Sequence, residues 1–255
     1  TYVFSRMRTL LEIFEVTSTI TFVCGFLLNL LLLCLIRRFS SRELGTYKYL
    51  LETFAAYDTF LVAVHHVTNP VHFKVIPAHT GFAIVADREY GILVPLLCFY
   101  SSCYAVPFAL LNIHLLYRYW TIKSPDRIAL FSQGKFIALL ITSAILLQIN
   151  WSISCYYLGK PEDDEDIRYY QSLFREEYEK DINEGLMILN YWRDGTLGIR
   201  PLFFLIIADT VEIVTVALAA TQATLTYLQI RKAQHISETA RAFQLQILLV
   251  LSAQV

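Results

Sequence analysis

Charged residues are scarce in this chain and are absent from its longest apolar segments. Aspartate, glutamate, lysine and arginine make up 17% of the 255 residues, and 56% of the residues are hydrophobic. The ranges 16–36, 90–117 and 136–159 contain none of the four charged residue types. A soluble helix of that length needs a polar face, whereas each range is long enough to cross a hydrocarbon core of about 30 Å at about 1.5 Å per residue. The sequence therefore predicts a polytopic membrane protein.

Motifs for catalysis and metal binding are also missing. The five cysteines have no CxxC spacing and do not cluster with histidine, so nothing indicates a metal site. The chain has no phosphate-binding glycine loop, no nucleophile elbow, no HExxH motif and no lysine deep in a predicted span for a Schiff base. The net charge of −1 gives no electrostatic reason to expect nucleic acid. We therefore expect no enzyme, no cofactor, no metal and no nucleic-acid partner.

The apolar segments predict five complete transmembrane helices and part of a sixth. Helices are favoured because the segments are too long for barrel strands and show no strict alternation. The predicted fold class is an all-α membrane protein with one transmembrane helical domain over residues 1–255. The predicted spans are about 13–36, 46–68, 90–117, 136–157, 201–230 and, incomplete, 241–255.

The two ends of the chain carry no complete targeting or terminal feature. Residues 1–15 lack the apolar core and cleavage site of a signal peptide, so we expect the first span to act as its own insertion signal. The chain begins at Thr1 and stops at Val255 inside an apolar run. We therefore expect the sequence to be a fragment or to be trimmed at both ends.

Basic residues gather in the loops on one side of the predicted membrane. These loops follow the first, third and fifth spans, and each carries more lysine and arginine than aspartate and glutamate. Their basic residues are Arg37, Arg38, Arg42, Lys48, Arg118, Lys123, Arg127, Lys135, Arg231, Lys232 and Arg241. Since cytoplasmic loops are enriched in lysine and arginine, we expect these loops in the cytosol and the N-terminus outside.

The segment 158–200 is predicted to be a long acidic extracellular loop. It begins with an uninterrupted acidic run at 162–166, and it contains no cysteine. Aromatic residues such as Tyr169 and Phe174 are interspersed, which indicates that part of the segment forms a short amphipathic helix. We interpret the acids mainly as solvated surface, with a lid or an ion-screening vestibule as the alternative.

Polar side chains inside the predicted spans need a partner, because their exposure to lipid is costly. Asn29 and Asp58 lie at nearly the same depth if the first two spans are antiparallel neighbours. We expect a direct contact or a shared water between them, serving as a structural clamp or as part of a switch or ion site. Asp209 and Glu212 are three residues apart and share a face of the fifth span. They either pack inside the bundle or contact a ligand or a coupling element.

Aromatic residues are frequent in the outer and middle parts of the third span. Phe99, Tyr100, Tyr104 and Phe108 fit either an apolar ligand cavity with a few polar groups or a belt at the membrane interface.

Cysteines and histidines add two further expectations. Cys98 and Cys155 lie near the same membrane face, and we expect them to be buried thiols, with a disulfide between them as the alternative. His65 and His66, at the outer end of the second span, and His114, near the inner end of the third, are expected to be interfacial, with a vestibule as the alternative for the first two.

Four short motifs stand in a fixed order relative to the predicted spans. They are Leu44-Gly45-Thr46-Tyr47-Lys48-Tyr49-Leu50, Pro70-Val71-His72, Tyr117-Arg118-Tyr119-Trp120, and Ser237-x-Thr239 followed by Gln244-Leu245-Gln246 and Gln254. In this order and topology the chain, from about Gly25 to Val255, resembles the nematode serpentine chemoreceptors of the Str class. These are seven-transmembrane G-protein-coupled receptors.

The resemblance implies a seven-transmembrane receptor-like bundle, of which this chain holds five complete spans and part of a sixth. It also implies a small odorant-like ligand, a cytoplasmic heterotrimeric G protein, and a multi-pass protein of the plasma membrane, with the sensory cilium as the implied site. Tyr117-Arg118-Tyr119 stands where the wider superfamily has Asp-Arg-Tyr, which implies a role in coupling and switching. Because Tyr117 replaces the acid, Arg118 has no acidic neighbour at that position and needs another partner, or has none.

Two other classes of function compete with a chemosensory receptor. A transporter or channel component would use Asp58, Asp209 and Glu212 as a path for cations or protons. A non-signalling membrane protein would act by association alone. We see no internal repeat, although Pro95 and Pro107 are placed to kink the third span. We therefore expect a receptor in which ligand binding in the outer half opens the inner face, with Arg118 and the loops 37–48 and 231–242 as the coupling surface.

Overall fold

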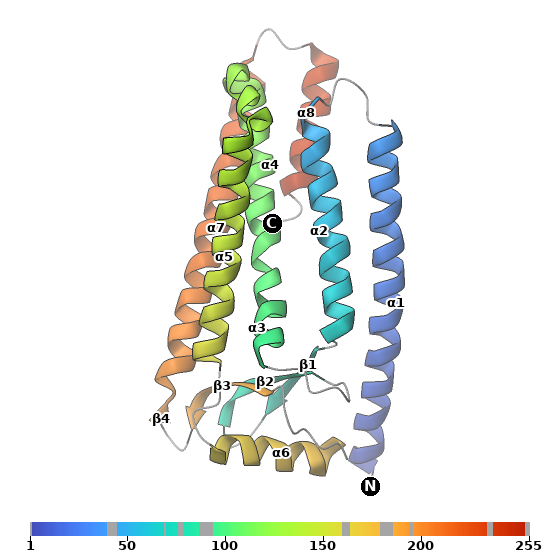
Figure 1. Cartoon of the computed structure of the whole chain (residues 1–255), viewed down its shortest axis with the longest axis vertical. Coiled ribbons are helices and arrows are strands. Elements are labelled where there is room, and N and C mark those ends of the chain that lie inside the picture. Colours follow the sequence, from blue (N-terminus) through green and yellow to red (C-terminus); the bar gives the residue numbers. More distant parts are fainter. Residues whose placement is uncertain are drawn as a thin grey trace.

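The chain forms long helices that lie side by side, with a small sheet and one crossing helix at one end (Figure 1). The computed structural model describes residues 2–39, 45–68, 70–75, 79–86, 94–159, 164–178, 186–193, 196–233 and 237–252. The helices of the bundle are α1 (Tyr2–Phe39), α2 (Tyr47–Thr68), α3 (Val94–Cys103), α4 (Ala105–Lys123), α5 (Gly134–Leu158), α7 (Ile199–Lys232) and α8 (Glu238–Ser252).

Four helical segments among the described residues are long and apolar enough to cross a membrane. They are Val16–Phe39, Val94–Lys123, Gly134–Leu158 and Ile199–Lys232. Helix α2 packs along α1 and carries Glu52 and Asp58, which make it less apolar than its neighbours. Helix α8 is a shorter helix over the start of the sixth predicted span. The predicted all-α bundle of a membrane protein is therefore confirmed.

The third predicted span is divided into α3 and α4 at Tyr104. Pro107 has no backbone N–H, so it cannot donate to the carbonyl four residues earlier, at Cys103. The hydroxyl of Tyr57, on α2, donates to that carbonyl at 2.8 Å instead. The division thus follows from Pro107, and a neighbouring helix satisfies the carbonyl that the proline leaves free.

A four-stranded antiparallel sheet lies at the end of the bundle nearest the N-terminus (Figure 1). Its strands, in order, are β1 (Pro70–Val75), β2 (His79–Ala86), β3 (Leu186–Arg193) and β4 (Thr196–Leu197). The pairing of β2 with β3 joins the connection between α2 and α3 to the segment before α7. This sheet was not predicted from the sequence. Segment 158–200 was expected to be mostly loop, and the structure instead places α6 (Asp164–Tyr178), β3 and β4 in it, with α6 as the expected short helix.

The helices pack together toward the end of the bundle away from the sheet. One buried cluster joins α4, α7 and α8, and it comprises Leu111, Leu115, Ile122, Ala219, Ile230, Ala233, Leu248 and Leu251. Helices α1 and α2 approach each other at Gly25, where an added Cβ would be in ordinary van der Waals contact with the Val62 side chain at 3.4 Å. Gly45 has a φ of 51°, a left-handed conformation that glycine adopts without strain as the chain turns into α2.

Candidate functional site

Arg118 lies buried among three helices at the end of the bundle away from the sheet. Only 5% of its surface is exposed, although it is a charged residue in a helical bundle. Its Nη1 donates to the Oε1 of Gln244, on α8, at 3.2 Å. Its guanidinium carbon lies 3.7 Å from the centre of the Tyr47 ring, on α2. One side chain on α4 therefore contacts the start of α2 and the middle of α8, and the set Tyr47–Arg118–Gln244 is called the arginine cluster below.

Hydrogen bonds fix the position of Tyr47 within the arginine cluster. Its hydroxyl lies 3.2 Å from Nδ1 of His114, which is 1% exposed. The His114 ring also meets the rings of Tyr47 and Phe54 edge to face. The hydroxyls of Thr46 and Tyr117 are 3.0 Å apart. The turn into α2 is thus bound to α4 by polar contacts to His114 and Tyr117, within one turn of Arg118.

Aromatic packing supports the arginine cluster from the connection between α4 and α5. This connection contains the 3₁₀ helix η2 (Pro125–Ser132), whose Phe131 is buried. The Phe131 ring lies 4.9 Å from the Tyr117 ring and 5.9 Å from the Trp120 ring, both at edge-to-face angles. Such pairs add about 0.5–1.5 kcal/mol each beyond the burial of their surface. Tyr117 is therefore a packing residue between α2 and η2, in the position where the wider superfamily has an acid.

Arg118 has unused hydrogen-bond donors. Its Nε and Nη2 are buried and make no hydrogen bond to any described residue, and no described carboxylate pairs with the guanidinium. A buried cation without a counter-charge is costly, and the Tyr47 ring offsets part of that cost through its negative face. The arrangement leaves the N–H groups of Nε and Nη2 available for an acceptor that reaches this end of the bundle.

The predicted aromatic residues are only partly brought together, in the half of the bundle near the sheet. Tyr100 is 3% exposed, and its hydroxyl lies 2.7 Å from both the Tyr104 hydroxyl and Nδ1 of His65. The Phe99 ring meets Phe60 edge to face and is partly exposed. Phe108 lies a turn further along α4, where its carbonyl accepts a hydrogen bond from Asn112. A polar triad of Tyr100, Tyr104 and His65 thus stands among aromatic rings between α2 and the third span.

The predicted intramembrane carboxylates do not form one site. Asp209 and Glu212 are exposed on α7, and Asp58 is half-buried on α2. The described residues contain no group of three or more His, Cys, Asp and Glu side chains placed to hold a metal ion. The amide of Asn29 donates to the Gly25 carbonyl of its own helix at 3.0 Å, and no direct Asn29–Asp58 hydrogen bond is formed. A shared water between these two residues stays a prediction.

Cys98 and Cys155 do lie together, in one buried cluster with Leu97, next to Trp151 and Phe204. The structure has both as free cysteines, so it shows the proximity and no bridge. The interpretation of these residues as buried thiols fits this arrangement.

Sequence reasoning did not identify the partners of Arg118. Tyr47 and Gln244 belong to two separate sequence motifs, which gave no indication that they meet. His114 was expected to be interfacial, whereas it is buried against Tyr47. The sequence did contain one indication of the arginine cluster, because three of the four motifs contribute one residue each to it. Tyr119, the third residue of its motif, is half-buried and is no member of the cluster.

These features define the chain as a polytopic α-helical membrane protein of receptor-like architecture, with a buried arginine that joins three helices. The sequence profile of the serpentine type 7TM GPCR chemoreceptor family Str matches residues 14–255, and the chain belongs to this family. The resemblance inferred from the motifs is thereby confirmed.

Curated relatives come from two nematodes. Serpentine receptor class r-10 of Caenorhabditis elegans is 28% identical over 112 residues, which are 42% of this chain and 32% of the relative. The protein of the same name from Caenorhabditis briggsae is 22% identical over 153 residues, 58% of this chain and 43% of the relative. The G-protein coupled receptor str-33 of Caenorhabditis elegans is 22% identical over 202 residues, 76% of this chain and 58% of the relative. The matched stretch therefore spans between about a third and three fifths of these relatives.

Proposed function

We propose that this chain is the ligand-sensing and coupling part of a chemoreceptor that detects a small odorant-like molecule and activates a cytoplasmic heterotrimeric G protein. Membership of a chemoreceptor family supports the class of activity. The observation that carries the coupling role is the buried Arg118, which has two nitrogen atoms without a hydrogen-bond partner and is held by one residue from α2 and one from α8.

The proposed orientation has the arginine cluster in the cytosol and the N-terminus outside. Figure 1 shows the C-terminal ends of α1, α4 and α7 at the same end of the bundle, away from the sheet. These ends carry Arg37 and Arg38, Lys123, and Arg231 and Lys232. Such enrichment in lysine and arginine is typical of the cytoplasmic side. The sheet and α6 are then extracellular.

The proposed switch is a change in the partner of Arg118. A hydrogen bond from a charged donor to a neutral acceptor contributes about 1.5–3 kcal/mol. A carboxylate adds the attraction between opposite charges and can accept two parallel N–H bonds from the guanidinium. The Gln244 amide is thus a weaker partner than a carboxylate would be. When α8 moves away from α4, Arg118 loses that partner and presents its guanidinium to a carbonyl or carboxylate of the G protein. A ligand that favours this state shifts the population toward it.

The proposed ligand site is in the outer half of the bundle. Tyr100, Tyr104 and His65 offer hydroxyl and imidazole groups next to the apolar ring of Phe99. Phe108, Asp209 and Glu212 stay in the proposal as residues that a larger ligand would reach. A few polar groups in an aromatic setting fit a small organic molecule with one hydrogen-bonding group.

The test measures G-protein activation by the full-length receptor in cells, with a panel of volatile organic compounds as the probe. We expect at least one compound to raise second-messenger levels, and Arg118→Gln to abolish that response at equal surface expression. Arg127→Gln is the matched control, because Arg127 is an exposed cation of the same side of the bundle. Proton-coupled uptake that is lost in Asp209→Asn, without any G-protein response, would instead support the transporter.

A further inference from the structure

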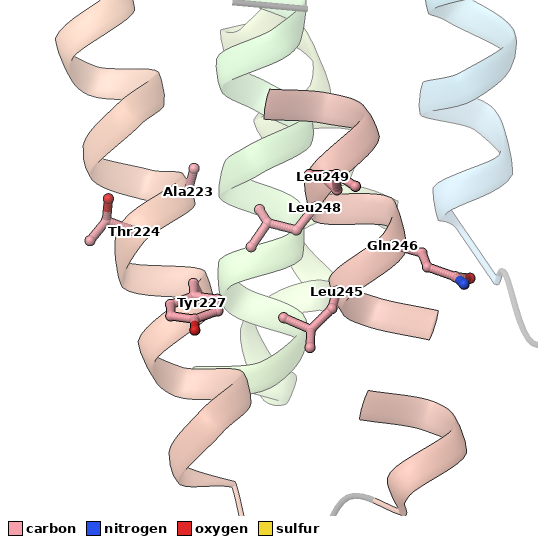
Figure 2. A pocket seen from close by; sticks show the side chains of 7 residues that line it. All are labelled: Ala223, Thr224, Tyr227, Leu245, Gln246, Leu248 and Leu249. Carbon is pink, nitrogen blue, oxygen red and sulfur yellow. The ribbon is translucent and has the colours of Figure 1, made fainter. Parts of the chain in front are cut away.

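A groove runs along the seam between α7 and α8, near their ends away from the sheet. It encloses about 560 Å³ and is lined by Ala223, Thr224, Tyr227, Leu245, Gln246, Leu248 and Leu249. Figure 2 shows Leu245 and Leu248 directed from α8 toward α7, while Gln246 points away. Leu248 also belongs to the buried cluster against α4, whereas 72% of Leu249 is exposed. The groove therefore lies on the exposed side of the packed seam, away from α4, and its lining is mostly apolar.

Positive charge stands at the end of this groove. Tyr227, a lining residue, lies one helical turn before Arg231, whose Nη1 donates to the Tyr227 hydroxyl at 3.3 Å. The Arg231 guanidinium carbon is 5.7 Å from the Tyr227 ring centre. Lys232 follows in the same last turn, and both cations are exposed. Glu238, at the start of α8, is the acid of this connection.

We propose that the groove binds an anionic phospholipid of the cytoplasmic leaflet. One acyl chain lies between α7 and α8 along Leu245, Leu249 and Ala223, and the phosphate group contacts Arg231 and Lys232. This inference goes beyond the proposed function, and it uses only the proposed orientation. The charge complementarity identifies the occupant, because an apolar groove that ends in two exposed cations at the membrane edge matches a lipid with an acyl tail and a negative head group. A neutral lipid matches only the apolar part.

The distribution of polar atoms supports a lipid rather than a soluble ligand. The lining offers the Thr224 hydroxyl, the Tyr227 hydroxyl and the Gln246 amide, and the last of these points away from the seam. Arg231 already uses the Tyr227 hydroxyl. Few convergent polar groups remain in the groove to orient a polar small molecule, whereas an acyl chain needs none.

The experiment uses the full chain in phosphatidylcholine nanodiscs that contain a small fraction of phosphatidylserine with a photoactivatable acyl chain. After illumination, mass spectrometry locates the labelled peptides. We expect labels on α7 and α8 around Thr224 and Leu249, and we expect unlabelled phosphatidylserine, but not phosphatidylcholine, to compete. The variant Arg231→Gln with Lys232→Gln should reduce labelling at these peptides about fivefold for each cation removed. Ala223→Trp, which fills the groove from the side of α7 that faces α8 (Figure 2) and keeps both cations, should also reduce labelling there.

The matched control is Lys123→Gln with Lys135→Gln, which removes two exposed cations on the same side but outside this seam. It should leave labelling of α7 and α8 unchanged. The proposal fails if phosphatidylcholine competes as well as phosphatidylserine, or if labels are spread evenly over all lipid-facing helices. It also fails if a second copy of the chain is cross-linked through α7 and α8, since the groove then belongs to a dimer contact.

Discussion

The guanidinium carbon of Arg118 lies 3.7 Å from the centre of the Tyr47 ring, so a cation on α4 rests on an aromatic face at the first residue of α2. This contact substitutes for the carboxylate that is absent at position 117. A desolvated cation–π contact contributes about 2 kcal/mol, less than the cost of a fully buried charge. Arg118 is therefore retained in the bundle without being firmly paired, which is the property that a switch residue requires.

Replacing Gln244 by glutamate should stabilise the arrangement in which α8 is held to Arg118 on α4. The carboxylate gives Arg118 an ionised partner, and a gain of about 1.4 kcal/mol corresponds to about tenfold in the population ratio. We expect Gln244→Glu to reduce ligand-independent nucleotide exchange on the G protein by about tenfold, and Gln244→Ala to increase it. Gln246→Glu is the matched control, because that side chain points away from the seam (Figure 2). Equal exchange rates in Gln244→Glu and Gln244→Ala would contradict the proposed role.

The ring and the hydroxyl of Tyr47 should make separable contributions to stability. Tyr47→Phe keeps the ring over Arg118 but removes the contact with His114, so we expect a loss of about 1 kcal/mol in the free energy of unfolding. Tyr47→Leu removes both interactions and should cost about 2–3 kcal/mol. Thermal unfolding in detergent measures both. If the two variants unfold at the same temperature, the ring makes no contribution of its own.

The hydroxyl of Tyr57 should matter only while residue 107 is proline. Tyr57→Phe leaves the Cys103 carbonyl without its partner, and we expect a cost of about 0.6–1.7 kcal/mol, the range of hydrogen bonds between membrane helices. Pro107→Ala restores an N–H that can donate to the same carbonyl. In the Pro107→Ala background, Tyr57→Phe should then cost little. A double-mutant cycle with no coupling between the two positions would disprove this account of the α3–α4 division.

The orientation of the bundle can be checked with single exposed cysteines. We expect a membrane-impermeant maleimide to label Thr196→Cys, which is exposed in β4, on intact cells. Ser132→Cys, in η2, should be labelled only after permeabilisation. The native cysteines all lie in helices of the bundle, and the unsubstituted chain provides the background. Labelling of Ser132→Cys on intact cells would reverse the proposed orientation.

The helices were predictable from the sequence because their signal is local. An absence of charge over 20 or more residues, as in the ranges 16–36, 90–117 and 136–159, needs no information about the rest of the chain. Pro95 and Pro107 were both candidates for a kink in the third span, and the structure divides it next to Pro107. The sheet was not predictable, because β2 and β3 are separated by about a hundred residues and their register depends on pairing between distant segments. The contact of Arg118 with Gln244 spans 126 positions in the sequence. Motif reading named both residues but gave no reason to place them together.

The sheet has a mechanical consequence for α7. Strand β4 leads through Gly198 into Ile199, the first residue of α7. Because β4 pairs with β3 and β3 pairs with β2, this end of α7 is anchored to the connection between α2 and α3. The helix has 34 residues, which corresponds to a length of about 51 Å. A tilt of about 5° around that anchored end displaces the far end by about 4 Å. A small tilt of α7 at the end next to the sheet therefore produces a larger displacement at Arg231 and at the neighbouring start of α8.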